Sequence, residues 1–267
     1  MKPPRRLPSP LDFREFWARL EASPRVLLVL DYDGTLSPLQ PDRDRAFPWP
    51  GVREALERIL SGGRTRLVLV SGREARQAAR LLGLDPSPET WGVHGRERLL
   101  PGGEFHSLPL EPAQAAALAE IGRALAETGF QDRVETKPGS VALHWRGVSP
   151  GHEAALRDLA RKRLEPLARP AGLEVRPFDG GVEFRAPGPT KGDALETLKK
   201  EEGPATPCAF LGDDLTDEEG FAALGPQDLP VLVGNPERPT RARFQLLGPE
   251  ELLAFLERWA SAMEGRS

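Results

Sequence analysis

The sequence predicts an α/β fold in which a mainly parallel β-sheet carries an inserted α+β module. Two patterns lead to this prediction. In the first and last parts of the chain, short and continuously apolar runs alternate with segments of helical periodicity, which is the order of βαβ units. Between about residues 111 and 187 the order becomes helix, strand, strand, and it occurs twice.

Continuous apolar runs mark the predicted strands of the main sheet. Strands that are apolar along their whole length are typical of parallel sheets covered by helices on both faces. The runs are RVLLVL (25–30), TRLVLV (65–70), CAFL (208–211) and LPVLVG (229–234), with helical patterns at GVREALERIL (51–60) and REARQAARLL (73–82). The prediction is therefore a Rossmann-like core domain, and such sheets bind ligands at the carboxyl ends of their strands.

The middle of the chain has a different pattern of elements. Helices are predicted at 112–129 and 151–168, and strands at 133–137, 140–146, 173–178 and 182–186, with a turn at Asp179, Gly180 and Gly181. This order predicts an antiparallel sheet with both helices on one face. We therefore assign residues 1–108 and 188–267 to the catalytic core domain, and residues 109–187 to an inserted domain that determines substrate specificity.

The inserted strands alternate between apolar and polar side chains, so one face is apolar and the other is small and polar. The polar set is Ser140, His144, Arg146, Glu183, Arg185 and, in VETK (134–137), Glu135 and Lys137. An ordinary sheet with one solvated face explains the alternation equally well. The mixture of Glu, Lys, His and Arg around small residues also suits recognition of hydroxyl groups.

Composition and charge exclude several classes of partner. With 36 basic and 40 acidic residues the formal net charge is −4, which predicts no nucleic-acid and no membrane partner. No apolar run could span a bilayer and no signal-type segment follows the amino terminus, so we expect a cytoplasmic protein. The single cysteine excludes a disulfide framework. Few thermolabile side chains and 28 prolines suggest a thermophile as the source.

Acidic residues at the ends of the core strands predict a Mg²⁺ site. Asp31 follows the first strand and GDDLTDEE (212–219) follows the CAFL strand, so their carboxylates meet at one edge of a parallel sheet. Asp31, Asp213 and either Asp214 or Asp217 would repel one another unless a hard cation lay among them. The four histidines show no ligand spacing, which favours Mg²⁺ over zinc.

Basic and hydroxyl groups at the same edge predict a phosphate site. Ser71, the amides of the SGR turn around Gly72, and Lys191 would hold a phosphate group. A carboxylate can attack phosphorus by forming an aspartyl-phosphate, which would make Asp31 the nucleophile. Asp33 can then protonate the leaving alcohol and later activate water. An Asx-turn with capping aspartates is the structural alternative, but four motifs in this order favour phosphoryl transfer.

These motifs resemble those of a known group of enzymes. DYDGT (31–35), SGR, Lys191 and GDDLTDEE are similar to the four motifs of the haloacid dehalogenase superfamily of Mg²⁺-dependent phosphatases, and the inserted module resembles the cap of its C2B branch. Within that branch, DYDGTLSP, VHGRE, VETKPGSVALHWR and VEFRAPGPTKGDAL resemble blocks of the trehalose-6-phosphate phosphatase family across nearly the whole chain. Trp145 and Thr136 depart mildly from the pattern of that family.

The resemblance implies a role for each matched residue. Asp31 would be the nucleophile and a metal ligand, and Asp33 the acid/base with its carbonyl on Mg²⁺. Asp213 would be the third protein ligand, and Asp217 would either support the ligands from behind or contact the metal through water. Lys191 would neutralise Asp31 as well as bind phosphate. The phosphate-binding residues would be Ser71, Gly72 and Lys191.

The resemblance also implies a substrate, trehalose 6-phosphate, which would be hydrolysed to trehalose and phosphate in trehalose biosynthesis. The residues implied to bind the sugar, or to lie where cap meets core, are Arg73, Gly95, Glu135, Lys137, His144, Arg146 and Glu183. The chain is too short to include a glycosyltransferase domain, so a separate trehalose-phosphate synthase would make the substrate.

Other functions stay open at this point. A phosphatase acting on sucrose 6-phosphate or mannosyl-3-phosphoglycerate would have the same core motifs, so only the inserted strands distinguish these substrates. A sugar phosphomutase would need a bisphosphate and an aspartyl-phosphate protected from water. A binding module without chemistry is disfavoured, because Asp31, Asp33, Lys191 and Asp213 are all present.

Overall fold

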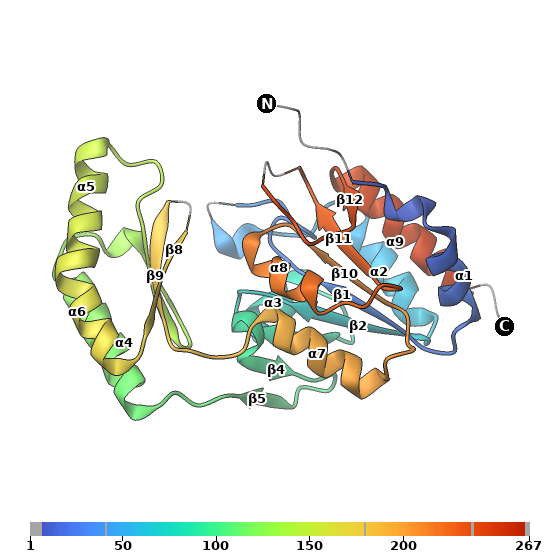
Figure 1. Ribbon diagram of the computed structural model, residues 1–267, viewed down its shortest axis with the longest axis horizontal. Helices are drawn as coiled ribbons and strands as arrows, with labels where there is room; N and C mark the ends of the chain where they lie inside the picture. The colour runs from blue at the N-terminus through green and yellow to red at the C-terminus, as the bar shows by residue number, and fades with distance from the viewer. Residues whose placement is uncertain (1–6, 41, 179, 236–237, 265–267) are drawn as a thin grey trace. The chain divides into compact units, whose positions relative to one another are not determined.

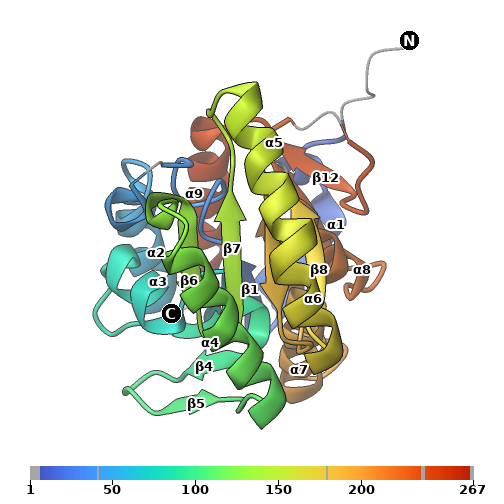
Figure 2. The same cartoon turned by 90° about the vertical axis from the view of Figure 1, so that its left-hand side faces the viewer.

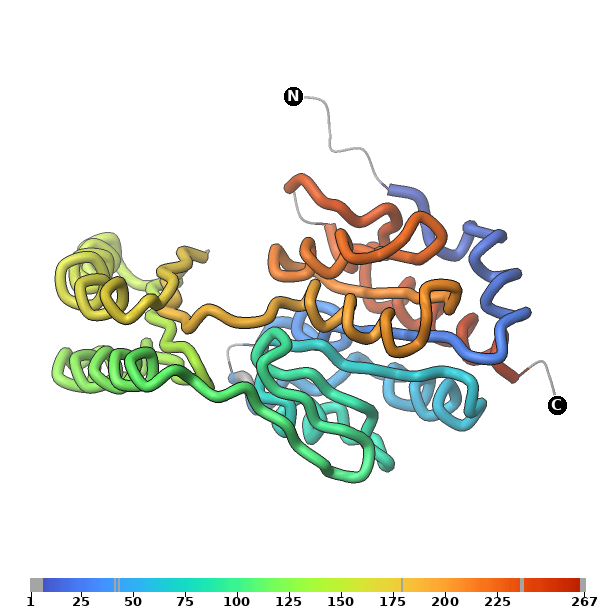
Figure 3. The backbone as a smooth tube through the Cα atoms, turned by 60° about the horizontal axis from the view of Figure 1, so that its bottom comes forward, coloured from blue at the N-terminus to red at the C-terminus, as the bar shows by residue number. Residues whose placement is uncertain are grey.

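The described residues form two β-sheets, one of eight strands and one of four, with helices packed against them (Figure 1). The computed structural model describes residues 7–40, 42–178, 180–235 and 238–264. The chain divides into a core unit, made of the residues before Leu108 and after Gly188, and an inserted unit, Leu108–Gly188. Figure 3 follows the chain out of the core unit after β5 (Phe105–Ser107) and back into it before α7 (Lys191–Glu202).

The core unit is built on an eight-stranded sheet. In the order in which they lie side by side, its strands are β12 (Phe244–Leu246), β11 (Leu229–Val233), β10 (Cys208–Gly212), β1 (Val26–Leu30), β2 (Thr65–Val70), β3 (Glu89–Gly92), β4 (Glu97–Leu99) and β5. The strands from β12 to β3 run parallel, and β4 and β5 extend the sheet antiparallel. The predicted α/β fold with a mainly parallel core sheet is confirmed.

Helices cover both faces of this sheet because its central strands are apolar on both sides. Besides α7, the core helices are α1 (Arg14–Ala22), α2 (Val52–Ser61), α3 (Ala75–Leu82), α8 (Glu218–Ala222) and α9 (Pro249–Glu264). All five residues of β1 are buried. Leu28 packs in the cluster formed with α1, α2, α3 and α9, and Leu27 packs in the cluster formed with α7 and α8. Burial on both faces fixes each central strand, and therefore the position at which the strand ends.

Several strands lack a readable signal in the sequence. β3 begins with Glu89, a buried carboxylate that pairs with Arg66 at 2.6 Å and with Arg98 at 2.8 Å, so its composition is not that of an apolar run. β4, β5 and β12 contain three residues each, which is too short to display a period.

The inserted unit has the helix-strand-strand order twice. Its antiparallel sheet consists of β6 (Val134–Lys137), β7 (Ser140–His144), β9 (Gly181–Arg185) and β8 (Glu174–Phe178), in that order. The helices α4 (Pro112–Ala126), α5 (Pro150–Leu159) and α6 (Glu165–Ala168) lie on one face of it (Figure 2), and a π-helical turn, Ala160–Leu164, joins α5 to α6. Val141, Leu143 and Phe184 pack in one cluster with residues of these helices. Asp179, part of the predicted turn, lies outside the described residues.

Among the helices of the described residues, none combines the length and the apolarity that crossing a membrane requires.

Candidate active site

The carboxyl ends of adjacent parallel strands place the first acidic residues. Asp31 directly follows β1 and Asp213 directly follows β10. The amide of Asp31 donates to the carbonyl of Leu211 at 2.9 Å, which continues the ladder by one residue. Side-chain oxygens of Asp31, Asp213 and Asp217 lie within 4.8 Å of one another. We call these three carboxylates the acidic group.

Lys191, the first residue of α7, supplies a cation to the acidic group. Its Nζ donates to Oδ1 of Asp31 at 2.6 Å and to Oδ1 of Asp217 at 2.7 Å, and all three side chains are buried. Burial alone would lower the pKa of Lys191, but Asp217 and Asp31 outweigh burial and raise it above its ordinary value. A capping box formed by Thr190 and Asp193 begins the helix here and fixes the point from which Lys191 reaches the carboxylates.

When fully ionised, the acidic group carries three negative charges against the single positive charge of Lys191. Burial raises the pKa of Asp31 to about 7, against the opposing effect of Lys191. Burial, together with repulsion from Asp31 and Asp217, raises the pKa of Asp213 to about 9. The buried Oδ1 of Asp213 has no hydrogen-bond partner among the described residues. An excess of carboxylate charge and an acceptor without a donor fit a hard divalent cation bound by oxygen atoms.

The turn after Asp31 is shaped by the neighbouring strand. A β-carbon on Gly34 would lie 2.0 Å from Oδ2 of Asp213, and the φ angle of Gly34 is +79°, so glycine is required here on both grounds. The hydroxyl of Thr35 donates to Oδ2 of Asp31 at 3.3 Å. Thr35 belongs to the D-x-D-G-T motif, but the motif alone assigned it no role.

Asp33 lies outside the acidic group and pairs with Arg73. The guanidinium of Arg73 donates from Nε at 2.7 Å and from Nη2 at 2.5 Å to the two carboxylate oxygens, and Arg73 is only 1% exposed. Arg73 also lies over the ring of Tyr32, 5.6 Å from its centroid. Arg73, which the family resemblance places near the substrate, therefore binds Asp33, the predicted acid/base, within the core unit.

The predicted phosphate-binding turn is held by a left-handed turn that follows β3. The carbonyls of Ser71 and Arg73 accept the amides of His94 at 2.9 Å and Val93 at 2.7 Å, and the hydroxyl of Ser71 accepts the amide of Arg73 at 3.1 Å. Val93 and His94 have φ angles of 48° and 57°, a region that β-branched residues rarely adopt. A β-carbon on Gly72 would lie 2.7 Å from Cε1 of His94, so glycine allows this close packing.

Gly95 ends the left-handed turn beside the start of α7. Its φ angle is +114°, and a β-carbon there would lie 3.1 Å from the carbonyl oxygen of Thr190. The predicted site residue Gly95 is thus a packing position directly before Lys191.

Four of the residues predicted to bind sugar lie on one face of the inserted sheet: Glu135, Lys137, His144 and Glu183. Glu135 and Glu183 pair in register with the same residue of β7 from opposite sides, so their side chains share a face. Glu135 lies 3.1 Å from the ammonium of Lys137 and 3.2 Å from Nε2 of His144. The hydroxyl of Ser140 donates to Glu183 at 2.6 Å. Several hydrogen-bonding groups therefore converge on this face.

Arg146 differs from the rest of that set. β7 ends at His144, two residues before the predicted end, and Trp145 packs in the hydrophobic cluster of the inserted unit. Arg146 is exposed beyond the strand, and its side chain lies beside Gly180. Strand periodicity therefore does not fix the direction of the Arg146 side chain.

Comparison with known proteins places the chain in a family. The family model described as trehalose-phosphatase matches residues 29–250, a range that includes all the motifs described above. The chain belongs to the trehalose-phosphatase family. Trehalose-phosphate phosphatase of Mycobacterium marinum is 31% identical over 262 residues, which cover 90% of this chain and 63% of that protein. The chain thus spans slightly less than two thirds of the length of this relative.

Solved structures with the same fold support the trehalose-phosphatase assignment. Aspergillus fumigatus trehalose-6-phosphate phosphatase has 25% sequence identity and a TM-score of 0.68, with 96% of this chain and 99% of that chain covered. A haloacid dehalogenase-like hydrolase from Bacteroides thetaiotaomicron has 20% identity and a TM-score of 0.61, with 88% and 99% covered, and supports the fold alone. The predicted haloacid dehalogenase fold is confirmed.

Two residues near the acidic group were not found from sequence patterns. Arg238 donates from Nη2 to the main-chain carbonyl of Asp213 at 3.0 Å, and its Nη1 pairs with the carboxylate of Glu218. Glu218 belongs to the GDDLTDEE motif, but its partner lies 20 residues further along the chain. No spacing rule connects such a pair, so the sequence contained no signal for it.

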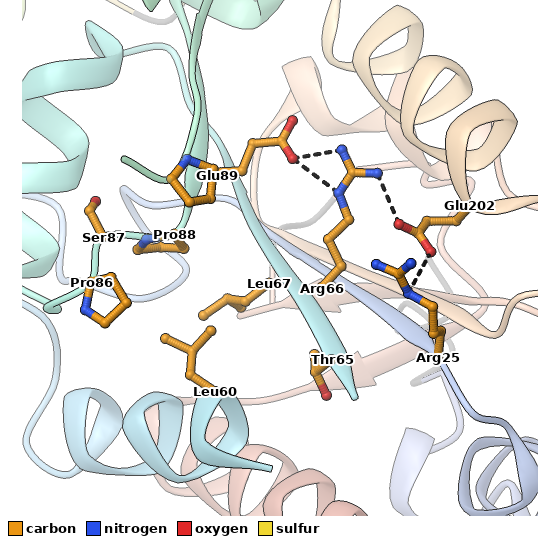
Figure 4. A pocket seen from close by; sticks show the side chains of 11 residues that line it. Arg25, Leu60, Thr65, Arg66, Leu67, Pro86, Ser87, Pro88, Glu89 and Glu202 are labelled. Carbon is orange, nitrogen blue, oxygen red and sulfur yellow. Dashed lines mark hydrogen bonds and ion pairs between the residues drawn. The ribbon is translucent and has the colours of Figure 1, made fainter. Parts of the chain in front are cut away.

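A cavity of about 340 Å³ lies at the opposite end of the core sheet (Figure 4). Its lining includes Thr65 and Glu89, the first residues of β2 and β3. Its charged side chains bind one another: Arg66 reaches Glu89 at 2.6 Å and Glu202 at 3.0 Å, and Arg25 lies 3.6 Å from Glu202. Ion-pair networks of this kind contribute most at high temperature, and a thermophilic source stays a prediction.

Proposed function

We propose that the chain is a phosphatase that hydrolyses trehalose 6-phosphate to trehalose and phosphate. The observation that carries this proposal is the buried carboxylate of Asp31, which lies 2.6 Å from Lys191 beside two further carboxylates at the ligand-binding edge of the sheet. Family membership supports the substrate, since the relative from M. marinum is named trehalose-phosphate phosphatase. A separate trehalose-phosphate synthase would make this substrate.

Asp31 would act as the nucleophile in the first step. One of its oxygens attacks phosphorus, the bond from phosphorus to the sugar oxygen breaks, and an aspartyl-phosphate remains on Asp31. Asp33 would act as the acid after one of its two hydrogen bonds to Arg73 opens, so that the released oxygen carries a proton. It donates this proton to the sugar oxygen as that bond breaks, so trehalose leaves as a neutral alcohol. Lys191 favours the ionised, nucleophilic form of Asp31, because it lowers the pKa of Asp31 against the effect of burial.

Water would release phosphate in the second step. Asp33, now ionised, accepts a proton from a water molecule as that water attacks phosphorus, and the bond from phosphorus to Asp31 breaks. The two hydrogen bonds from Arg73 hold the carboxylate of Asp33 and so define where its oxygens lie. The hydroxyl of Ser71 and the amide of Gly72, in a turn fixed by the left-handed turn behind it, would bind the phosphate oxygens in both steps.

Mg²⁺ is the cation that we propose for the acidic group. Asp31 and Asp213 would hold it together with the main-chain carbonyl of Asp33, and Asp217 would contact it through water. When bound, it would neutralise charge on the oxygens of the transferring phosphoryl group. The all-oxygen donor set and the unpartnered Oδ1 of Asp213 support this choice.

The affinity for Mg²⁺ is expected to rise with pH. Burial raises the pKa of Asp31 to about 7 and that of Asp213 to about 9, so below those values each carboxyl must lose a proton before it binds the ion. Each proton released on binding makes the affinity rise by about tenfold per pH unit. Calorimetric titration of the substrate-free protein with Mg²⁺ measures this slope. Asp213→Asn should remove the part of the slope above neutral pH, and an affinity independent of pH would contradict the proposed ligands.

Substrate choice is expected to depend on the polar face of the inserted sheet. We expect kcat/KM for phosphate release to be highest with trehalose 6-phosphate in a panel that includes sucrose 6-phosphate and mannosyl-3-phosphoglycerate. Glu183→Gln and Lys137→Ala each remove a charged hydrogen-bonding group, which should lower kcat/KM for the disaccharide phosphate by about 10- to 100-fold. The same variants should change the hydrolysis of p-nitrophenyl phosphate, which has no sugar, by less than about threefold.

A matched control for this experiment is Glu153→Gln. Glu153 lies on α5 of the inserted unit and pairs with Arg157 at 2.7 Å, away from the polar face of the sheet. It should behave as wild type on every substrate. Equal losses on both substrates for Glu183→Gln would show a structural role for Glu183. A higher kcat/KM for another sugar phosphate would refute the proposed substrate.

A further inference from the structure

Arg238 contacts the main chain of Asp213 from a part of the chain that contains none of the four motifs. It lies in the segment between β11 and β12, and its side chain is 16% exposed. Nη2 donates to the main-chain carbonyl of Asp213 at 3.0 Å, while Nη1 pairs with Glu218, the first residue of α8. The second oxygen of Glu218 accepts the amide of Arg241 at 2.6 Å. Arg238 thus connects its own segment to the loop after β10.

The position of the Asp213 side chain depends on its main chain. Its Oδ1 has no partner among the described residues, so that oxygen is not held by a neighbouring side chain. The amide of Asp213 donates to Oδ2 of Asp217 at 3.1 Å, and the amide of Asp214 donates to the same oxygen at 2.9 Å. Asp217 therefore fixes the main chain on the amide side, and Arg238 fixes it on the carbonyl side.

We propose that Arg238 is a positioning residue that fixes Asp213 as a ligand of the divalent cation, with Glu218 holding the guanidinium in place. This inference rests on the proposed function, in which Asp213 is a metal ligand. Groups that orient metal ligands typically contribute 10- to 100-fold to metal affinity. A guanidinium suits this role because its planar fork binds a carboxylate and a carbonyl at the same time in a fixed geometry.

Removal of Arg238 should therefore weaken metal binding without removing any ligand. In Arg238→Ala the Mg²⁺ dissociation constant of the substrate-free protein, measured by calorimetry, should increase by about 10- to 100-fold. The Mg²⁺ concentration for half-maximal phosphate release should rise by a similar factor, and kcat should recover largely at saturating Mg²⁺. Arg238→Lys and Glu218→Gln each keep one of the two contacts and should give intermediate dissociation constants.

Arg243→Ala is the matched control. Arg243 is also a partly buried arginine of the core unit, and it donates to main-chain carbonyls of the loop that precedes β11, Gly225 at 2.8 Å among them. Its removal should lower thermal stability and leave the Mg²⁺ dissociation constant unchanged. A purely structural role for Arg238 would reduce the fraction of protein that binds Mg²⁺, but not the affinity of the folded fraction.

The outcomes separate this inference from the proposed function. Wild-type protein that binds no Mg²⁺ would overturn the metal assignment and the role of Arg238 with it. Wild-type binding with an unchanged dissociation constant in Arg238→Ala, or an equal increase in Arg243→Ala, would overturn the role of Arg238 alone. If Arg238→Ala does not fold, as circular dichroism would show, Arg238→Lys and Glu218→Gln decide: wild-type affinity in both overturns the inference.

Discussion

Asp31→Asn is expected to lower kcat for phosphate release from trehalose 6-phosphate by about 10⁴-fold or more, because losses of this order follow when an enzyme loses its nucleophile. The asparagine amide does not form the acyl phosphate, although it has nearly the same shape as the carboxylate. Binding of the substrate should change much less than turnover, since the contacts to the sugar come from other residues. Phosphate release at high enzyme concentration and calorimetric binding of the substrate measure the two effects separately.

The same variant should keep its folding stability in Mg²⁺-free buffer. Burial raises the pKa of Asp31 to about 7 in the folded protein. A carboxyl with a raised pKa makes the folded protein less stable as pH rises from the pKa of the unfolded chain to that of the folded one. A neutral asparagine avoids this loss, so above neutral pH Asp31→Asn should unfold at or above the temperature of the wild type. Lys191 keeps its other partner, Asp217, at 2.7 Å.

Asp228→Asn provides the matched control for Asp31→Asn. Asp228 is a buried carboxylate of the core unit that pairs with Lys199, a second lysine of α7, at 3.1 Å. Its substitution should cost stability and leave kcat unchanged. Phosphate release at the wild-type rate by Asp31→Asn, or a loss fully explained by unfolding, would show that another group attacks phosphorus.

The central strands and the residues at their ends could be predicted from the sequence for one physical reason. A strand buried on both faces must be apolar throughout, as β1 is, and its carboxyl end is then marked by the first charged residue, Asp31. The same logic locates Asp213 after β10. Both residues were expected at one edge of the sheet, and their oxygens lie within 4.8 Å of each other.

Pairs formed across long stretches of chain could not be predicted in this way. The ion pair of Asp33 with Arg73 joins residues that the sequence placed at the same edge but gave separate roles. The bond from Arg238 to the carbonyl of Asp213 depends on a loop position that no periodicity describes. The strand β3 was not predicted, because it begins with Glu89, which pairs with two arginines, and so it does not have the composition of an apolar run. Such contacts follow from the packed fold rather than from local pattern.

Lys191→Met is expected to lower both folding stability and activity. Methionine fills a similar volume without a charge, so Asp31 and Asp217 lose hydrogen bonds of 2.6 and 2.7 Å while they stay buried beside Asp213. Removal of one partner of a buried ion pair costs about 3–5 kcal/mol, and we expect the free energy of unfolding to fall by about that amount in Mg²⁺-free buffer near pH 8. Chemical denaturation measures this change. In the control, Lys199→Met, the loss should be smaller and kcat should stay unchanged.

The pH dependence of Lys191→Met separates a catalytic role of Lys191 from a structural one. Lys191 lowers the pKa of Asp31 against the effect of burial, so its removal raises that pKa further. The acid limb of the kcat/KM profile, which follows ionisation of Asp31, should then move to higher pH, whereas a folding defect would lower kcat/KM equally at every pH. Added Mg²⁺ restores a cation to the acidic group and should recover more stability in Lys191→Met than in wild type or Lys199→Met. An unshifted acid limb would mean that Lys191 contributes to stability alone.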